Sequence, residues 1–118
     1  MSVLITGIDT LGPWGCGMAK LSSALQSGNC ALSEIERGRG LHRSQSARMV
    51  GAVDNSGYDQ WLSGVVARRM SQSSRMALAT ARMAAESAGL EASEVGGART
   101  AVSLGNSIGP SGFTVRLL

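Results

Sequence analysis

A stripe of small apolar residues between Ser71 and Gly89 constrains the fold more than any other feature of this chain. Ser71 is a suitable N-cap, and Gly89 followed by Leu90 is typical of a glycine C-cap with its hydrophobic contact. Alanine side chains are too short to reach across a gap, so the backbone of such a helix must approach its neighbour closely. The pattern therefore predicts a helix buried on its alanine face. The stripe consists of Ala77, Leu78, Ala81, Ala84, Ala85 and Ala88.

Two short apolar runs predict strands buried on both faces. Residues 3–6 (Val-Leu-Ile-Thr) end at a glycine, and residues 100–104 (Thr-Ala-Val-Ser-Leu) lead into a glycine-rich loop over 105–112. The stretch between them has the length of a crossover, and a right-handed crossover places both strands in one sheet with the helix on its face. The class predicted is therefore α/β.

Weaker elements complete the predicted order. Met18, Leu21, Ala24 and Leu25 recur at helical spacing over 16–26, and Ser-Gly-Asn at 27–29 ends that helix. Residues 48–53 suggest a short edge strand and 58–63 a short helix. The predicted order along the chain is therefore a strand, a helix, a short strand with a short helix, the alanine-rich helix, a second strand and the glycine-rich loop.

The composition indicates that these elements need further neighbours. Apolar residues make up 43% of the 118 residues but aromatic residues only 3%, so small side chains must fill the core at close spacing. Two or three strands do not make a sheet covered on both faces, and the apolar residues over 113–118 would have no partner. We expect residues 1–118 to be the incomplete N-terminal part of a larger layered α/β domain.

Several protein classes are disfavoured. No run approaches the roughly 20 apolar residues of a membrane span, and no secretory signal is present, so we expect a cytoplasmic protein. Cys16 and Cys30 have no metal-ligand spacing, and we expect no metal site. The net charge of +3 comes mainly from arginines and suits an acidic partner. Nucleic acid is disfavoured because aromatic stacking residues are scarce.

Catalytic and nucleotide-binding motifs are also incomplete. The glycines over 7–17 do not follow the dinucleotide spacing, and no Gly-Lys-Ser/Thr follows the loop over 105–112. Cys16 opens a helix, where its pKa could be lowered, but the single histidine, His42, lies in an aperiodic loop with no partner. We therefore expect no catalytic residue and no cofactor within this chain.

Three segments in order resemble the N-terminal part of a β-ketoacyl synthase, a condensing enzyme with the thiolase-like fold. Residues 3–15 resemble the family's opening strand and turn, 67–90 its Arg-Arg-Met segment and alanine-rich helix, and 100–109 its next strand and glycine loop. The chain departs from the family at Ser71, where Asp is usual, at Gly12, where Ser is usual, and at Pro110, where a second glycine is common.

The resemblance implies condensation of acyl and malonyl units on acyl carrier protein in fatty-acid or polyketide synthesis, by a homodimer or heterodimer in the full-length protein. The catalytic cysteine and the two histidines, or histidine and asparagine, lie downstream of the matched region. The chain alone is thus expected to be inactive. The resemblance also implies that Arg68 and Arg69 help dock the acidic carrier protein, and that Ile108 lies beside the acyl-chain pocket.

Two other functions stay open at this point. The chain could be a complete, short, non-catalytic partner of a synthase, for which a sharp two-state melt is expected. A small nucleotide-binding α/β protein would instead bind nucleotide saturably. Neither alternative requires the missing catalytic residues.

Overall fold

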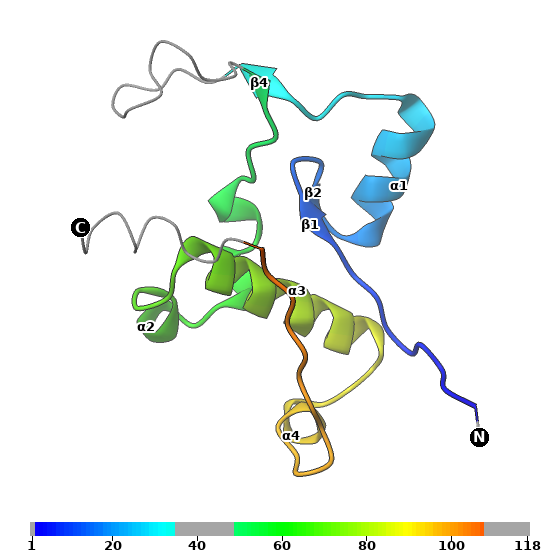
Figure 1. The fold of residues 1–118 in the computed structure, drawn as a ribbon, viewed down its shortest axis with the longest axis vertical. Helices are drawn as coiled ribbons and strands as arrows, with labels where there is room; N and C mark the ends of the chain where they lie inside the picture. The colour runs from blue at the N-terminus through cyan, green and yellow to red at the C-terminus, as the bar shows by residue number, and fades with distance from the viewer. Residues whose placement is uncertain (1, 35–48, 108–118) are drawn as a thin grey trace.

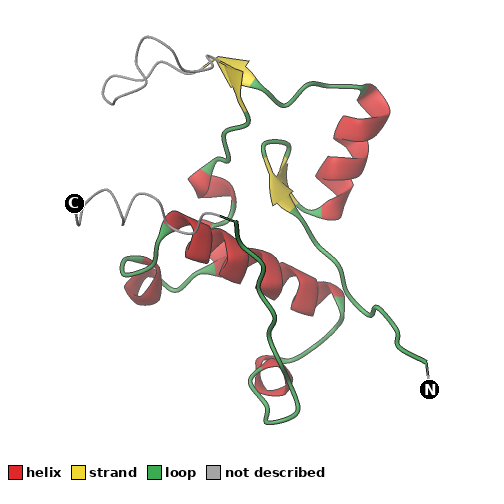
Figure 2. Ribbon diagram, viewed as in Figure 1, coloured by secondary structure: helices red, strands yellow, loops and turns green. Residues whose placement is uncertain are grey.

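The computed structural model describes residues 2–34 and 49–107, and these form a mixed α/β arrangement of helices and very short strands (Figures 1 and 2). The helices are α1 (Met18–Ser27), α2 (Gly64–Ala67), α3 (Gln72–Ser87) and α4 (Ala92–Val95), with two 3-10 turns, η1 (Asn55–Gly57) and η2 (Asp59–Trp61). The strands are β1 (Leu11–Gly12), β2 (Gly15–Cys16), β3 (Ser33–Glu34) and β4 (Met49–Val50).

The strands form two separate antiparallel ladders. β1 pairs with β2 in the register Leu11 to Cys16, and β3 pairs with β4 in the register Ser33 to Val50. The β1–β2 hairpin leads directly into α1. That helix ends at Gly28, whose φ of 65° is left-handed and whose N–H donates to the Leu25 carbonyl. The helix predicted over 16–26 is therefore confirmed to within two residues.

The caps of α3 are confirmed in detail. The Ser71 hydroxyl accepts a hydrogen bond from the Ser74 N–H at 3.2 Å, as an N-cap does. At the other end Gly89 has a φ of 68°, its N–H donates to the Glu86 carbonyl, and the Leu90 N–H donates to the Ala85 carbonyl at 3.0 Å. These two bonds are the Schellman pattern, which only a left-handed residue such as glycine completes easily.

The buried face of α3 differs from the prediction. Among the described residues, the buried side chains are Ala79, Met83 and Tyr58, and none belongs to the alanine stripe, of which Ala81 is exposed. At 3.6 residues per turn, Ala79 and Met83 lie on roughly the opposite side of the helix from that stripe. The reason is tertiary: the segment that carries η1 and η2 packs on this side and supplies the large ring of Tyr58.

The alanine stripe nevertheless allows one close approach. A Cβ added at Gly7 would lie 2.3 Å from the Ala84 carbonyl oxygen and 2.7 Å from the Ala88 Cβ. The N-terminal segment thus crosses the end of α3 at backbone contact distance, which only a glycine facing an alanine permits.

The two predicted buried strands are wrong for the described residues. Residues 3–6 and 100–104 are not in any strand and are exposed on both faces: Val3 is 96% exposed, Ile5 86% and Val102 86%. A strand needs a hydrogen-bonded neighbour, and none of the described elements lies beside either run as a ladder partner. Within the predicted edge strand over 48–53 the structure has β4, and within the predicted short helix over 58–63 it has the 3-10 turn η2.

The described elements are spread out. The Cα radius of gyration is 16.9 Å, whereas a compact domain of this length has about 13–14 Å. Among the described residues, no helix combines the length and apolar character needed to cross a membrane.

Candidate functional site

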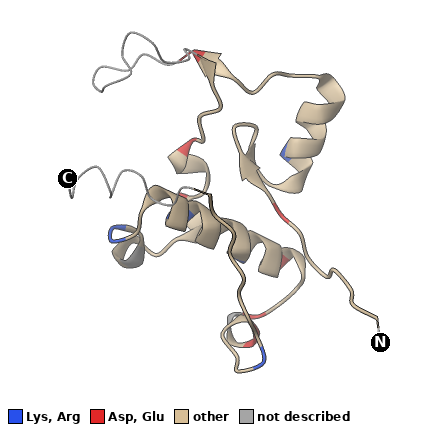
Figure 3. Cartoon of the chain, viewed as in Figure 1, with Lys and Arg blue, Asp and Glu red and all other residues tan. Residues whose placement is uncertain are grey.

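Arg68 and Arg69 form an exposed basic turn between α2 and α3 (Figure 3). The turn is closed by a hydrogen bond from the Met70 N–H to the Ala67 carbonyl at 3.2 Å. Neither guanidinium forms an ion pair with a carboxylate of the residues that the structure describes. Both positive charges are therefore available to an external partner.

The N-terminus of α3 adds to this positive potential. A helix of 16 residues carries about half a positive charge at its N-terminus, and the first turn of α3 contains no acidic residue. The hydroxyls of Ser71, Ser73 and Ser74 lie together there, with oxygen separations of 3.0 and 2.9 Å. The acidic residues Glu86, Glu91 and Glu94 lie towards the opposite end of α3 and around α4 (Figure 3).

The two arginines of α3, in contrast, are already engaged and hold the preceding segment in place. Arg75 forms an ion pair with Asp59, and its Cζ lies 5.8 Å from the centroid of the Tyr58 ring. Arg82 donates a hydrogen bond to the Trp61 carbonyl. These contacts fix η2 against α3 and so determine how the basic turn is presented.

A side-chain network centred on Tyr58 completes the support. The Tyr58 hydroxyl donates to the Asn55 Oδ1 at 2.6 Å, and Gln72 Nε2 donates to the same oxygen at 3.2 Å. Burial raises the pKa of the Tyr58 hydroxyl, against the opposing effect of the nearby Arg75 charge. Sequence reasoning missed this network. The spacing of Arg75 and Arg82 by seven residues, which puts both on one helix face, was the signal available.

Cys16 is engaged structurally. Its Sγ–H donates to the Gly57 carbonyl at 3.1 Å, which ties the β1–β2 hairpin to η1 across 41 residues of sequence. Burial raises the pKa of the Cys16 thiol, and the charge of Lys20 only partly offsets this. A nucleophilic cysteine needs a lowered thiol pKa, because the thiolate is the reactive form. Cys30 is exposed.

Two of the remaining residues considered in the sequence analysis have no described position in the structure. Ile108 and His42 lie outside the described residues. Within the described ranges no group of three or more His, Cys, Asp or Glu side chains could hold a metal ion.

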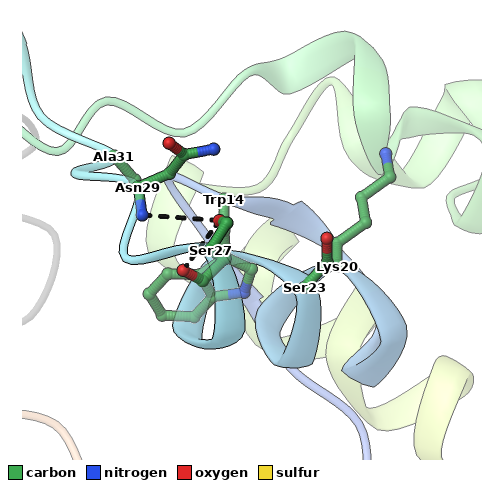
Figure 4. A pocket seen from close by; sticks show the side chains of 7 residues that line it. Trp14, Lys20, Ser23, Ser27, Asn29 and Ala31 are labelled. Carbon is green, nitrogen blue, oxygen red and sulfur yellow. Dashed lines mark hydrogen bonds between the residues drawn. The ribbon is translucent and has the colours of Figure 1, made fainter.

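A shallow groove of about 290 Å³ lies on α1 and contains none of the predicted site residues (Figure 4). Its Ser27 hydroxyl is already used, donating to the Ala24 carbonyl and accepting from the Asn29 N–H at 3.4 Å. The indole N–H of Trp14 is buried without an acceptor among the described residues. The lining residues are Trp14, Lys20, Ser23, Ala24, Ser27, Asn29 and Ala31.

Comparison with known proteins assigns the chain to a family. No curated protein and no solved structure matches it significantly. The family model described as "Beta-ketoacyl synthase, N-terminal domain" matches residues 1–117, which is nearly the whole chain. The chain therefore belongs to the β-ketoacyl synthase N-terminal domain family.

Proposed function

We propose that this chain is the N-terminal part of a condensing enzyme that joins acyl and malonyl units on acyl carrier protein, and that it is inactive alone. The proposal extends to the thiolase-like layered architecture of that family. In this account the chain contributes scaffold and a docking face, while the nucleophilic cysteine and the histidines come from the remainder of the enzyme.

The observation that carries the proposal is the basic turn at Arg68 and Arg69 in a chain that matches the family over residues 1–117. Two guanidinium groups that pair with no carboxylate in the described part of the chain, beside the positive end of a helix, attract an acidic protein surface and orient it. The raised pKa of Cys16 is consistent with a chain that carries no nucleophile of its own. We further propose that Ile108 borders the acyl-chain pocket once the remainder of the enzyme is present.

Calorimetric titration with acyl carrier protein tests the docking role. Reversing both charges in the variant Arg68→Glu/Arg69→Glu should weaken binding by roughly tenfold or more, and added salt should weaken binding to the unaltered chain. The matched control is Arg99→Glu, an exposed arginine just after α4. Equal weakening by the control would show that net charge, and not the basic turn, determines binding.

Intact-mass measurement tests the proposed inactivity. After incubation with acyl carrier protein loaded with an acyl group, the mass of the chain should be unchanged. Transfer of the acyl group to Cys16 or Cys30 would refute the proposal.

A further inference from the structure

The basic turn ends at a serine. Arg68 and Arg69 stand three and two positions before Ser71, and they are the only two adjacent arginines in the sequence. Ser71 is therefore the one serine or threonine of the chain with arginine at both positions. Both arginines are exposed, and they pair with no carboxylate in the described part of the chain. Because guanidinium groups bind carboxylates in a fixed, two-pronged geometry, this spacing suits an enzyme that recognises its substrate through an acidic groove.

The backbone at Ser71 is accessible to such an enzyme. Its φ of −64° and ψ of 158° are extended, and the residue lies just before the first residue of α3. The turn that precedes it is closed by the Met70 N–H, which donates to the Ala67 carbonyl at 3.2 Å. A short surface turn of this kind opens at low cost compared with a helix. The segment 68–71 can therefore enter an extended binding groove while Gln72–Ser87 stays helical.

A phosphate on the Ser71 oxygen meets hydrogen-bond donors and positive charge. The hydroxyl oxygens of Ser73 and Ser74 lie 3.0 and 2.9 Å from the Ser71 Oγ, and the Ser74 N–H already donates to it at 3.2 Å. The first turn of α3 has no acidic residue to repel the phosphate. A phosphoserine carries about −1.5 to −2 charges at pH 7, so it offsets the two positive charges of Arg68 and Arg69. The basic turn then presents almost no net charge.

These features assign a regulatory role to Ser71. We propose that Ser71 is phosphorylated by a serine/threonine kinase that recognises the two preceding arginines, and that the phosphate prevents an acidic protein from docking at the basic turn. In this reaction the Ser71 oxygen attacks the terminal phosphorus of a nucleoside triphosphate. The new O–P bond forms as the bond to the departing nucleoside diphosphate breaks, and the hydroxyl proton passes to a catalytic aspartate of the kinase. The modification site is independent of the proposed function, whereas the effect on docking rests on it.

Phosphorylation in vitro tests the site. The probe is the catalytic subunit of cyclic AMP-dependent protein kinase with magnesium ATP, and the product is mapped by fragment-ion mass spectrometry of the tryptic peptide that contains residues 70–75. We expect one phosphate in this peptide, on Ser71. Ser71→Ala should remove it. The matched control Ser87→Ala, at the last residue of α3, should keep it, because no arginine lies at the three positions before Ser87.

The variant Arg68→Gln/Arg69→Gln separates recognition of the two arginines from simple exposure of the hydroxyl. It should slow phosphorylation of Ser71 by roughly tenfold or more, because the acidic groove of the kinase loses both of its charged contacts. Phosphate on Ser73 or Ser74 in place of Ser71, or an unchanged rate in the glutamine variant, would overturn the proposal. So would the absence of phosphate from Ser71 in protein purified from its own cells at all growth stages.

Calorimetric titration of the phosphorylated chain with acyl carrier protein tests the effect on docking. Binding should be weaker than that of the unphosphorylated chain by roughly tenfold or more, since the phosphate cancels the attraction of the basic turn. Equal binding of the two forms would refute the effect on docking. Failure of the unphosphorylated chain to bind would instead refute the proposed function, and the mass map tests the modification site separately from both.

Discussion

The burial of Met83 on α3 predicts a large and specific cost for Met83→Ala. The Met83 side chain is 3% exposed, and the other buried side chains among the described residues are Tyr58 and Ala79. The substitution removes three heavy atoms beyond Cβ, and at about 0.8 kcal/mol for each the transfer cost is about 2.4 kcal/mol. Because so small a core can partly collapse around the vacated space, we expect about 2–3 kcal/mol in total.

The free energy of unfolding should be measured by urea titration, followed by circular dichroism at 222 nm and at one protein concentration. The matched control is Met18→Ala, the same chemical change in helix α1 at a side chain that is 39% exposed. The control should cost less than about 1 kcal/mol. If the two variants agree within about 0.5 kcal/mol, the conclusion that the core lies on the Met83 face of α3 is refuted.

Two further predictions concern titratable groups. Iodoacetamide should alkylate exposed Cys30 faster than Cys16, because burial raises the pKa of the Cys16 thiol. The alkylation rates of the two cysteines, resolved by mass spectrometry, should converge when urea unfolds the chain. Equal rates in the folded state would contradict the hydrogen bond from Cys16 to the Gly57 carbonyl. Hydrogen bonds from the Ser56 hydroxyl and N–H lower the pKa of Asp54, so its contribution to stability is present above the ordinary carboxyl pKa and is lost as pH falls through the lowered one. Carboxyl NMR should show this carboxyl titrating below the ordinary Asp value of about 3.9, and an ordinary midpoint would contradict these hydrogen bonds.

Local signals in the sequence predicted the ends of α3 well. Ser71 and Gly89 act through hydrogen bonds to residues within five positions, so the sequence nearby contains all the information required. The buried face of the same helix could not be predicted in this way. It depends on which segment packs against the helix, and η2, which contacts α3, precedes it in the sequence and is separated from it by α2 and the basic turn.

Two apolar runs show a second limit of sequence reasoning. The apolar runs at 3–6 and 100–104 have the composition of buried strands, and composition alone predicts a sheet. Burial also needs a partner for every backbone N–H and C=O, and the described part of the chain supplies none. The predicted contact of the alanine stripe was correct at one point only, where Gly7 crosses the end of α3.

The family resemblance identified the residues of the candidate site, whereas the contacts that hold this part of the chain in place became known only from the structure. The sequence identified Arg68 and Arg69 but gave no indication of what holds them. The ion pair of Arg75 with Asp59 and the hydrogen bond from Arg82 to the Trp61 carbonyl hold η2 against α3, and they connect residues 16 and 21 positions apart. Pairs at such separations are not visible in a single sequence.

The docking of acyl carrier protein at Arg68 and Arg69 is tested most directly by a chemical-shift map of the isotope-labelled chain titrated with acyl carrier protein. We expect the perturbed amides to cluster over residues 67–75, which comprise the basic turn and the first turn of α3. A map without perturbation, or one centred on the α1 groove around Trp14 and Ser23, would contradict the assignment of a carrier-protein docking face to Arg68 and Arg69.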